Sequence, residues 1–358
     1  MAEPLRVAYT LEQCWHRVPG GTAVAALEVL RELALRPELE MVAVAGTHGG
    51  PPVTPWDPGM PISALPGAGA RLYAGWVFAG RPIVERVTGP VQVAHATSII
   101  ACASRAPLVA TVHDLAFLHE PAHFTRWGRT LFRASLARLR RRGALVLCSS
   151  QATADDCVHA GLDASRVRIV PLGVRPPSPV GSDEARAIRA RLGLPDGYVL
   201  SVGTLEPRKN LARLAEAVQV CGLGLDLVVV GPDGWGDAGT PPGVRCTGFL
   251  SAEELAAVYA GASVVAYPSL REGFGLPVLE AMAAGAPVVT SLGTATEEVA
   301  GDAAVLVEPT SISSIAAGLG DAFERRAELI ARGRVRAATF TWSRTAELTA
   351  AAYAEAAA

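Results

Sequence analysis

The sequence predicts an α/β protein with two domains, each of which is a doubly wound parallel sheet. Apolar, β-branched segments recur along the chain and alternate with helix-length segments, as expected when crossover helices join parallel strands. At 358 residues the chain is longer than one core usually supports, which favours two domains. A segment rich in proline, glycine and serine, from Pro171 to Ala187, has the composition of a linker.

The alternation defines strand candidates on both sides of the linker. They are residues 5–10, 40–46, 91–95, 108–112, 144–148 and 167–171, then 198–203, 225–231, 243–247, 262–267, 286–290 and 303–307. We therefore expect a first domain over residues 1–175 and a second over residues 176–340. The alanine-rich C-terminal residues 346–358 are expected to form a helix.

The charge balance and the composition exclude several classes of protein. The formal net charge is −2, whereas proteins that bind the phosphates of nucleic acids need a basic surplus. No apolar run reaches the length of a membrane span and the N-terminus lacks a signal-peptide pattern, so we expect a cytoplasmic protein. The six cysteines are scattered, which predicts neither a zinc site nor a disulfide framework.

One predicted helix of the first domain carries a local surplus of positive charge. Its arginines, interleaved with apolar residues, are Arg126, Arg129, Arg133, Arg138, Arg140, Arg141 and Arg142. Such a helix more often packs on the core and exposes a solvated basic face. It can also lie on an anionic membrane surface, so peripheral contact with the inner face of the membrane stays an open alternative.

The most informative segment contains two glutamates, Glu272 and Glu280, around a glycine-rich turn. Pro277 fits the first position of a helix and Gly285 fits its C-terminal cap, so a short helix is expected from about residue 277 to 284. The glycines let a ligand approach the backbone N–H groups at the helix N-terminus, which predicts an anion site for phosphate. Alternatively, Glu280 is an ordinary first-turn residue on a solvated face.

A second segment, Val199 to Ala217, predicts a strand, a turn and an amphipathic helix. Arg208 and Lys209 stand in the turn, at the carboxyl end of the strand, where open parallel sheets bind ligands. Two adjacent cations at that edge suit a diphosphate. A lone basic pair is usually solvated, but the anion site predicted in the same half of the chain favours ligand binding.

Two segments of the first domain also follow predicted strands. Gly20 and Gly21 form a turn before a helix that is expected to begin at Thr22, without the glycine spacing of dinucleotide sites. His113 and Asp114 follow the strand at 108–112 and are therefore expected at the carboxyl edge of the first sheet. A lone histidine is more often structural.

Together these segments resemble family 4 of the retaining, nucleotide-sugar-dependent glycosyltransferases, which have the GT-B fold. The other matching segments are residues 19–22, 111–115, 149–153, 170–174, 247–250 and 298–304, so the resemblance covers most of the chain. It implies two Rossmann-like domains facing a cleft, with the nucleotide sugar on the second domain and the acceptor on the first. It also implies a C-terminal helix, residues 341–358, that crosses back to the first domain.

The resemblance implies roles for individual residues. The expected catalytic residues are Glu272, His113, Arg208 and Lys209, of which the two cations would neutralise the leaving diphosphate in place of a metal ion. The residues expected to bind the donor are Gly21, Arg208, Lys209, Phe249, Leu250, Glu272, Gly273, Phe274, Gly275, Leu276 and Glu280. Gly20, Thr22 and Asp114 are expected on the acceptor side. No Asp-x-Asp triplet occurs in the sequence, so no metal and no other cofactor is expected.

The function implied is transfer of a hexose, with retention of configuration, to an acceptor hydroxyl of a glycan, a glycolipid or a small molecule. The segment Gly203 to Asn210 is most similar to mannosyltransferase-like members, which favours GDP-mannose as donor and places UDP-sugars next. Two alternatives are a nucleotide-sugar epimerase on the same fold and a non-catalytic subunit that binds nucleotide sugars. Only a transferase needs an acceptor to make product.

Overall fold

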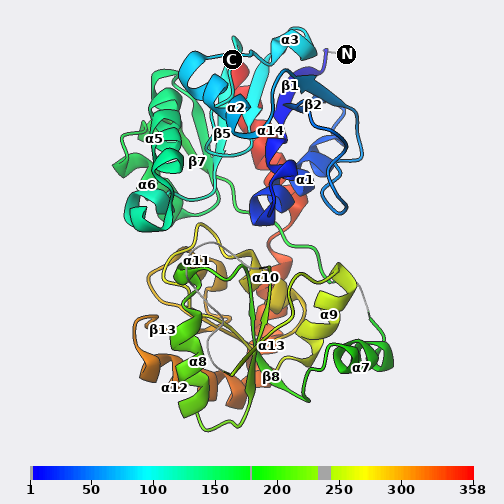
Figure 1. Cartoon of the computed structure of the whole chain (residues 1–358), viewed down its shortest axis with the longest axis vertical. Coiled ribbons are helices and arrows are strands. Elements are labelled where there is room, and N and C mark those ends of the chain that lie inside the picture. The colour runs from blue at the N-terminus through cyan, green and yellow to red at the C-terminus, as the bar shows by residue number, and fades with distance from the viewer. Residues whose placement is uncertain (1–2, 178–179, 233–242) are drawn as a thin grey trace. The chain divides into compact units, whose positions relative to one another are not determined.

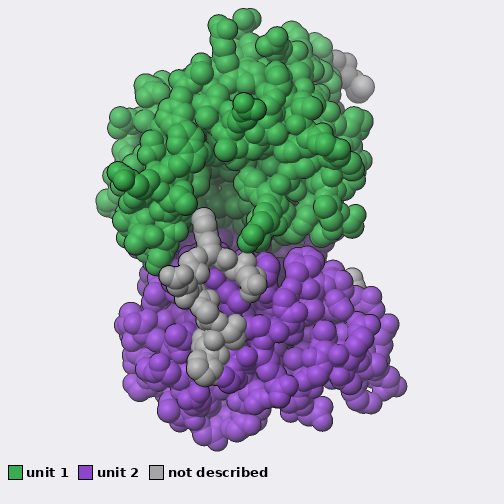
Figure 2. Space-filling model, viewed as in Figure 1, with its two compact units in different colours: residues 1–173, 342–358 green, residues 174–341 purple. Residues whose placement is uncertain are grey.

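The computed structural model of the protein describes residues 3–177, 180–232 and 243–358. The chain divides into two compact units, which Figure 2 colours separately. Unit 1 comprises Met1–Gly173 and Trp342–Ala358, and unit 2 comprises Val174–Thr341. Each unit contains a sheet of parallel strands with helices around it, which confirms the predicted α/β class (Figure 1).

The sheet of unit 1 has seven strands in the order β3-β2-β1-β4-β5-β6-β7. The strands are β1 (Leu5–Thr10), β2 (Leu39–Gly46), β3 (Ile62–Leu65), β4 (Val93–Ala96), β5 (Leu108–Val112), β6 (Leu145–Cys148) and β7 (Val167–Ile169). Leu5 lies opposite Leu39 and Ala94 opposite Leu108, in parallel register. The order reverses between β1 and β4, and ligands of such sheets bind beyond the carboxyl ends of the strands at this point.

The edge strand β3 is the one strand of unit 1 that the sequence analysis does not predict. It has only four residues, it lies between Pro61 and Pro66, and it pairs only with β2. Proline is common beside edge strands because it has no N–H to donate. The same prolines make the segment look like a loop in the sequence.

Helices cover both faces of the sheet in unit 1. They are α1 (Gly20–Leu33), α2 (Gly69–Ala74), α3 (Glu85–Thr88), α4 (Ala116–His119), α5 (Arg126–Arg141), α6 (Gln151–His159) and α14 (Trp342–Ala357), with short turns η1 (Glu12–Trp15), η2 (Gly75–Ala79), η3 (Pro121–His123) and η4 (Ala164–Arg166). The Thr125 side chain accepts a hydrogen bond from Gly128 N and so caps α5. The Ser150 side chain caps α6 through Thr153 N.

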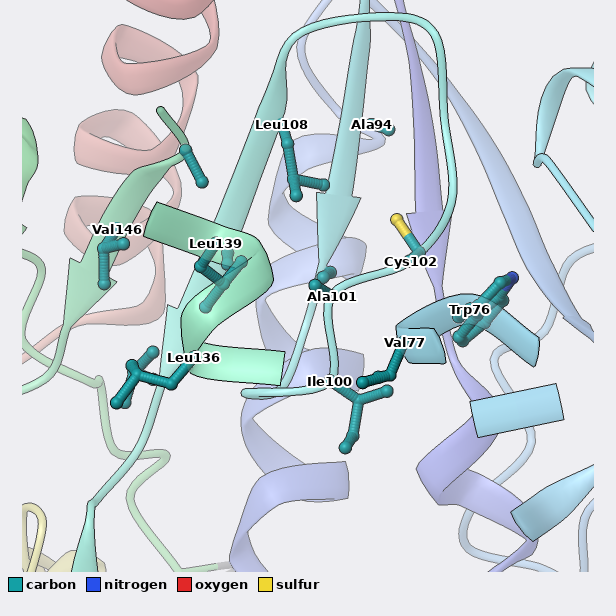
Figure 3. Close-up of a cluster of buried hydrophobic side chains, with 14 of the residues drawn as sticks. Trp76, Val77, Ala94, Ile100, Ala101, Cys102, Leu108, Leu136, Leu139 and Val146 are labelled. Carbon is teal, nitrogen blue, oxygen red and sulfur yellow. The ribbon is translucent and has the colours of Figure 1, made fainter. Parts of the chain in front are cut away.

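One apolar cluster fills the space between the sheet and α5 (Figure 3). Leu136 and Leu139 of α5 pack with Val146 of β6 and Leu108 of β5, and Trp76 of η2 joins them. These side chains are less than a tenth exposed. Burying each of them contributes roughly 1.5–3 kcal/mol before the entropy of ordering is subtracted. The helix with the arginines is therefore held to unit 1 by its apolar face.

The sheet of unit 2 has six strands in the order β10-β9-β8-β11-β12-β13. The strands are β8 (Tyr198–Val202), β9 (Asp226–Val230), β10 (Val244–Cys246), β11 (Val264–Tyr267), β12 (Val288–Ser291) and β13 (Val305–Val307). Here the order reverses between β8 and β11. Both strands are buried and rich in valine, as expected of central strands with helices on both faces.

The helices of unit 2 begin and end at residues with clear local signals. They are α7 (Ser182–Arg191), α8 (Leu211–Val220), α9 (Ala252–Gly261), α10 (Leu276–Ala283), α11 (Ala295–Ala300), α12 (Ile312–Glu324) and α13 (Arg326–Ala338), with the turn η5 (Pro207–Lys209). Ser251 and Glu254 form a capping box at the start of α9. Helix α7 occupies the last residues of the predicted linker, because Asp183 and Glu184 in its first turn favour a helix start there.

No helix in the described parts of the chain combines the length and the apolar character that crossing a membrane requires.

The C-terminal helix α14, drawn in red in Figure 1, packs against α1 and the central strands of unit 1. Ala94 and Ala96 of β4 point into the cluster beneath α5, so His95 between them points to the opposite face. There its Nδ1 lies 2.6 Å from the Tyr353 hydroxyl of α14, and its Nε2 lies 2.8 Å from Thr111 Oγ1. Burial, with a smaller contribution from the charge of His113, lowers the pKa of His95 to about 3.

The buried His95 predicts that unit 1 loses stability in mild acid. Below its ordinary pKa of 6.5 the unfolded chain binds a proton that the folded protein excludes, so stability falls as the pH drops from 6.5 towards 3. Between about pH 7 and pH 5 we expect His95 to cost about 2 kcal/mol of unfolding free energy. Urea unfolding at both pH values measures this loss, which should shrink in a His95→Gln variant. An unchanged pH dependence in that variant would contradict the assignment.

Candidate functional site

The loops after β8 and β9 approach each other at the carboxyl edge of the unit 2 sheet. Gly231, which follows β9, has a φ of 153°. A Cβ at this position would lie 2.1 Å from the carbonyl oxygen of Gly203, the residue after β8, so only glycine allows the approach. From Gly203 the chain continues along this edge into η5, which contains Arg208 and Lys209.

Lys209 and Glu272 form a buried ion pair at this edge. Lys209 Nζ lies 2.7 Å from Glu272 Oε1, and the two side chains are 9% and 7% exposed. Arg208 Nη1 lies 3.2 Å from Glu272 Oε2, and Arg208 Nε lies 2.7 Å from Glu206 Oε2. Lys209 Nζ also donates to the hydroxyl of Tyr267, the last residue of β11. One carboxylate from the loop after β11 therefore holds both cations from the loop after β8.

Asn210 fixes the loop that carries the two cations. It adopts a left-handed backbone conformation, with a φ of 61°. Its side-chain amide donates to the carbonyl oxygens of Pro268 at 3.0 Å and Pro309 at 2.6 Å, which compensates for this conformation. In addition, Leu270 N donates to the Arg208 carbonyl at 2.8 Å. The cations are thus positioned by backbone contacts as well as by Glu272.

Burial and charge act in opposite directions on this ion pair. Burial alone would raise the pKa of Glu272, but Lys209 and Arg208 hold it below its ordinary value. Burial lowers the pKa of Lys209, and the Glu272 carboxylate offsets this only in part. Burial, followed by the charge of Glu272, raises the pKa of Tyr267 well above its usual value, so the phenol stays neutral. Each charge of the pair depends on the other.

Lys209 is the only lysine in the sequence, and every other permanently cationic side chain is an arginine. An ammonium group is compact and carries three N–H donors, whereas a guanidinium is a wide, planar fork. Glu272 and Tyr267 take two of these donors. The third has no partner among the described residues. It is therefore a donor that a ligand can use.

Helix α10 begins next to this cluster. Its N-cap, Gly275, has a φ of 104°, and a Cβ there would lie 2.6 Å from Thr296 Cγ2. The turn therefore requires glycine, and it brings the N-terminus of an eight-residue helix to the same edge. At the other end Gly285 N donates to Met282 O and Ala286 N donates to Ala281 O, which is a Schellman cap. The predicted helix is confirmed within one residue at each end.

Glu280 lies in α10 and has a partner that the sequence analysis does not predict. The Tyr259 hydroxyl, from α9, donates to Glu280 Oε2 at 3.1 Å. Burial raises the pKa of Glu280, and this hydrogen bond opposes the shift. No cation compensates the carboxylate within the described residues. Glu280 is therefore a half-buried acceptor whose other oxygen is left for hydroxyl donors.

The remaining residues expected to bind the donor differ in exposure. Phe249, in the loop after β10, is 63% exposed, whereas its neighbour Leu250 is buried. Phe274 is also buried, and its ring packs edge-on against Phe340 at a centroid distance of 6.0 Å. Gly273 is buried and Leu276 is half-buried at the start of α10. Of this group, Phe249 presents the largest free apolar surface.

The expected residues of unit 1 lie at the carboxyl edge of its own sheet. Gly20, Gly21 and Thr22 open α1, and Thr22 Oγ1 donates to Pro19 O at 3.1 Å. His113 and Asp114 follow β5, and Asp114 Oδ1 accepts from Ala116 N at 3.0 Å. Burial lowers the pKa of His113, and Asp114 offsets this in part.

Thr97 links these two segments of unit 1. Its N–H donates to Thr10 Oγ1 at the end of β1, and its carbonyl oxygen lies 3.3 Å from His113 Nε2. The structure thus brings His113 to the switch point of unit 1, and it brings Arg208, Lys209 and Glu272 together in unit 2. The contacts of Tyr259 and Tyr267 are indicated by no sequence motif, and Asn210 lies in a matching segment that does not reveal its hydrogen bonds.

Two family models match most of the chain. Residues 19–176 match the family model described as Glycosyltransferase Family 4, and residues 185–337 match the model described as Glycosyl transferases group 1. An O-antigen chain mannosyltransferase B from Escherichia coli is 38% identical over 173 residues, which cover 44% of this chain. The chain spans only 45% of the length of that relative.

Two further comparisons cover nearly the whole chain. A D-inositol 3-phosphate glycosyltransferase from Xylanimonas cellulosilytica is 30% identical over 94% of this chain and 92% of its own length. The crystal structure of HepE from Anabaena, in complex with UDP-glucose, superposes with a TM-score of 0.76. It covers 98% of this chain and 100% of the HepE chain, at 18% sequence identity. The structural likeness supports the fold.

The buried ion pair predicts an unequal response to two charge-removing substitutions in unit 2. Lys209→Met leaves Glu272 buried with only Arg208, so we expect a loss of about 3 kcal/mol, the low end for a broken buried pair. Arg245→Met removes an exposed pair, in which Arg245 Nε lies 3.1 Å from Asp226, and should have little effect. Urea unfolding of both variants measures the difference. Similar losses would contradict the importance of the buried pair.

Proposed function

Because the chain belongs to family 4 of the glycosyltransferases, we propose that it transfers a hexose from a nucleotide diphosphate sugar to an acceptor hydroxyl, with retention of configuration. The observation that carries this proposal is the cluster of Lys209, Arg208 and Glu272 beside the N-terminus of α10. Fixed cations and a helix N-terminus at one sheet edge suit the diphosphate of such a donor.

In the proposed mechanism, the two cations stabilise the diphosphate as it leaves. Negative charge develops on the leaving phosphate oxygens in the transition state, and donors held in advance stabilise it without reorganisation. Lys209 would use its third N–H for this, while Glu272 and Tyr267 hold the other two. Glu272 would also accept hydrogen bonds from hydroxyls of the donor sugar. With two cations in place, we propose that no metal ion is needed.

We assign the nucleoside to the surface between Glu280 and the loop after β10. Glu280 would accept hydrogen bonds from the ribose hydroxyls, and Tyr259 would hold it in place. Phe249 and Leu250, together with the backbone of Gly273 to Leu276, would complete the donor contacts. GDP-mannose is the favoured donor, because the relative with 38% identity is named as a mannosyltransferase. UDP-sugars rank next.

We assign the acceptor to unit 1. His113, which we propose as a catalytic residue, has a lowered pKa and is therefore neutral at pH 7, so it can exchange hydrogen bonds with sugar hydroxyls. Gly20 and Thr22, which we assign to the acceptor, lie at the same edge of this sheet, as does Asp114. Gly21 lies between them and keeps its proposed role as a donor contact. Assays with and without an added acceptor distinguish a transferase from the two alternatives, an epimerase and a non-catalytic binding subunit. An epimerase converts its nucleotide sugar without an acceptor, and a binding subunit converts nothing.

The donor site predicts metal-independent binding of one nucleotide. We expect calorimetric titration with GDP, UDP and ADP, in the presence of EDTA, to give micromolar affinity for one of them, GDP first. Lys209→Ala should weaken that binding at least tenfold, because a lost charge-assisted hydrogen bond costs about 1.5–3 kcal/mol. Arg245→Ala, an exposed arginine of the same unit, is the control. Absence of binding by all three nucleotides would overturn the donor-site assignment.

We also propose that unit 1 contacts an anionic membrane surface through α5. Residues 121–154 contain seven arginines and neither aspartate nor glutamate. Phe78 of η2 and Trp127 of α5 are 52% and 50% exposed, and their ring centroids are 5.8 Å apart. Exposed aromatic rings beside arginines are typical of helices that lie at a membrane interface.

This contact predicts sedimentation with anionic but not with neutral vesicles. We expect binding to vesicles that contain phosphatidylglycerol, little binding to phosphatidylcholine alone, and a decrease as salt is added. Binding to the anionic vesicles should be abolished in a variant that combines Arg126→Glu, Arg129→Glu and Arg133→Glu. The combination Arg186→Glu, Arg191→Glu and Arg245→Glu in unit 2 makes the same charge change and should leave that binding intact. Equal losses in both would mean that only net charge matters.

A further inference from the structure

Unit 1 has an open groove whose lining residues have no role in the proposed function so far. Its volume is about 350 Å³, within the range of small-molecule sites. Its walls come from η1, from the segment after β2 and from β3, and they include Trp15, His48, Pro52, Asp57, Met60 and Ile62. Trp15 follows β1 and His48 follows β2, so the groove reaches the carboxyl edge of the sheet. His113 and the start of α1 lie at that same edge.

One wall of the groove is a pair of stacked rings. The rings of Trp15 and His48 are almost parallel, at an interplanar angle of 6° and a centroid distance of 4.4 Å. Trp15 Nε1 donates to the Gly50 carbonyl at 3.0 Å, which fixes the indole. The indole N–H of Trp15 is therefore satisfied, and the pair presents a flat aromatic surface to the groove.

A buried carboxylate holds this wall in place. Glu12, in η1, is 1% exposed and accepts hydrogen bonds from Gly46 N at 2.6 Å and from Gly69 N. His48 Nε2 lies 3.1 Å from Glu12 Oε1. Glu12 thereby joins η1, the segment after β2 and the start of α2. A surface fixed in this way loses little conformational freedom when a ligand binds.

The charge of the groove limits what it can bind. Asp57 Oδ1 accepts from Gly59 N at 2.8 Å, and Oδ2 has no hydrogen-bond partner among the described residues. No lysine or arginine lines the groove within the described parts of the chain, and the one histidine faces Glu12. A phosphate in the groove would approach a carboxylate without a cation to compensate it. An alkyl chain would cover Asp57 and remove its water without a donor in return.

We infer that this groove binds an uncharged saccharide, which rests on the proposed function because the saccharide would be the acceptor. The apolar C–H face of a pyranose would lie on the Trp15–His48 wall, and its hydroxyls would donate to Asp57. The acceptor class is then a neutral glycan end and not a sugar phosphate or an inositol phosphate. Trp15, His48 and Asp57 are its specificity-determining residues.

The inference is tested by binding of neutral and phosphorylated sugars to the full chain. The probes are methyl α-mannoside, mannobiose, chitobiose, cellobiose and mannose 6-phosphate, each measured by ligand-observed NMR, with nucleotide binding measured on the same samples. We expect at least one neutral probe to bind and mannose 6-phosphate to bind at least tenfold more weakly than it, which corresponds to about 1.4 kcal/mol. Trp15→Ala should weaken the neutral probe about tenfold and leave nucleotide affinity unchanged.

An inversion of charge provides a second, independent variant. Asp57 is exposed, so Asp57→Lys should fold normally, weaken the neutral probe and strengthen mannose 6-phosphate. Val53→Ala is the matched control, because Val53 lies in the same segment but is 79% exposed and outside the groove. Its affinities should equal those of the unmodified protein.

The outcomes separate this inference from the proposed function. If a nucleotide binds but no neutral sugar does, the inference is wrong and the donor site stands. The inference is also wrong if mannose 6-phosphate binds best, or if neither Trp15→Ala nor Asp57→Lys alters sugar affinity. If neutral sugars bind as expected but no nucleotide does, the groove is a saccharide site and the transferase proposal fails.

Discussion

The buried carboxylate of Glu272 is the group on which the arrangement of unit 2 depends. A charge with 7% exposure is costly to bury unless it is paired, and here two cations pair with it. Those cations belong to the loop after β8, whereas Glu272 belongs to the loop after β11, the two central strands at the switch point. The ion pair therefore fixes the relative position of the two loops between which a ligand of this fold binds.

Unit 1 also buries a carboxylate, but it stabilises that charge in a different way. Glu12 follows its first strand and is more deeply buried than Glu272, but its partners are two backbone N–H groups and a histidine. Backbone donors neutralise only part of a negative charge, and among the described residues no lysine or arginine lines the groove beside Glu12 that could attract a phosphate. In unit 2 the carboxylate of Glu272 pairs with two cations, whereas in unit 1 the carboxylate of Glu12 accepts hydrogen bonds from backbone N–H dipoles. That difference makes one edge suitable for an anion and the other for uncharged hydroxyl groups.

The sequence predicts the parts of this structure that local rules determine. The α10 helix and twelve of the described strands follow from proline, glycine and β-branched residues at positions that the backbone itself requires. The strand β3 is missed because its flanking prolines are read as a loop. Tyr259, Tyr267 and Glu12 are missed because their partners lie far away in the sequence, and nothing local distinguishes a buried tyrosine that holds a carboxylate from one that only fills a core. The placement of Arg208, Lys209 and Glu272 at one sheet edge follows from topology, but their hydrogen bonds require the coordinates.

The single lysine, Lys209, also makes selective chemical labelling of the protein possible. Its ε-amino group, held between a carboxylate and a phenol, is chemically unlike any other group in this sequence. Among the side chains of this sequence, only Lys209 can therefore react with reagents that acylate or reductively alkylate primary amines. Lys209 is therefore a single labelling site for an isotopic or fluorescent group at the ion pair itself, and no substitution is needed to create it.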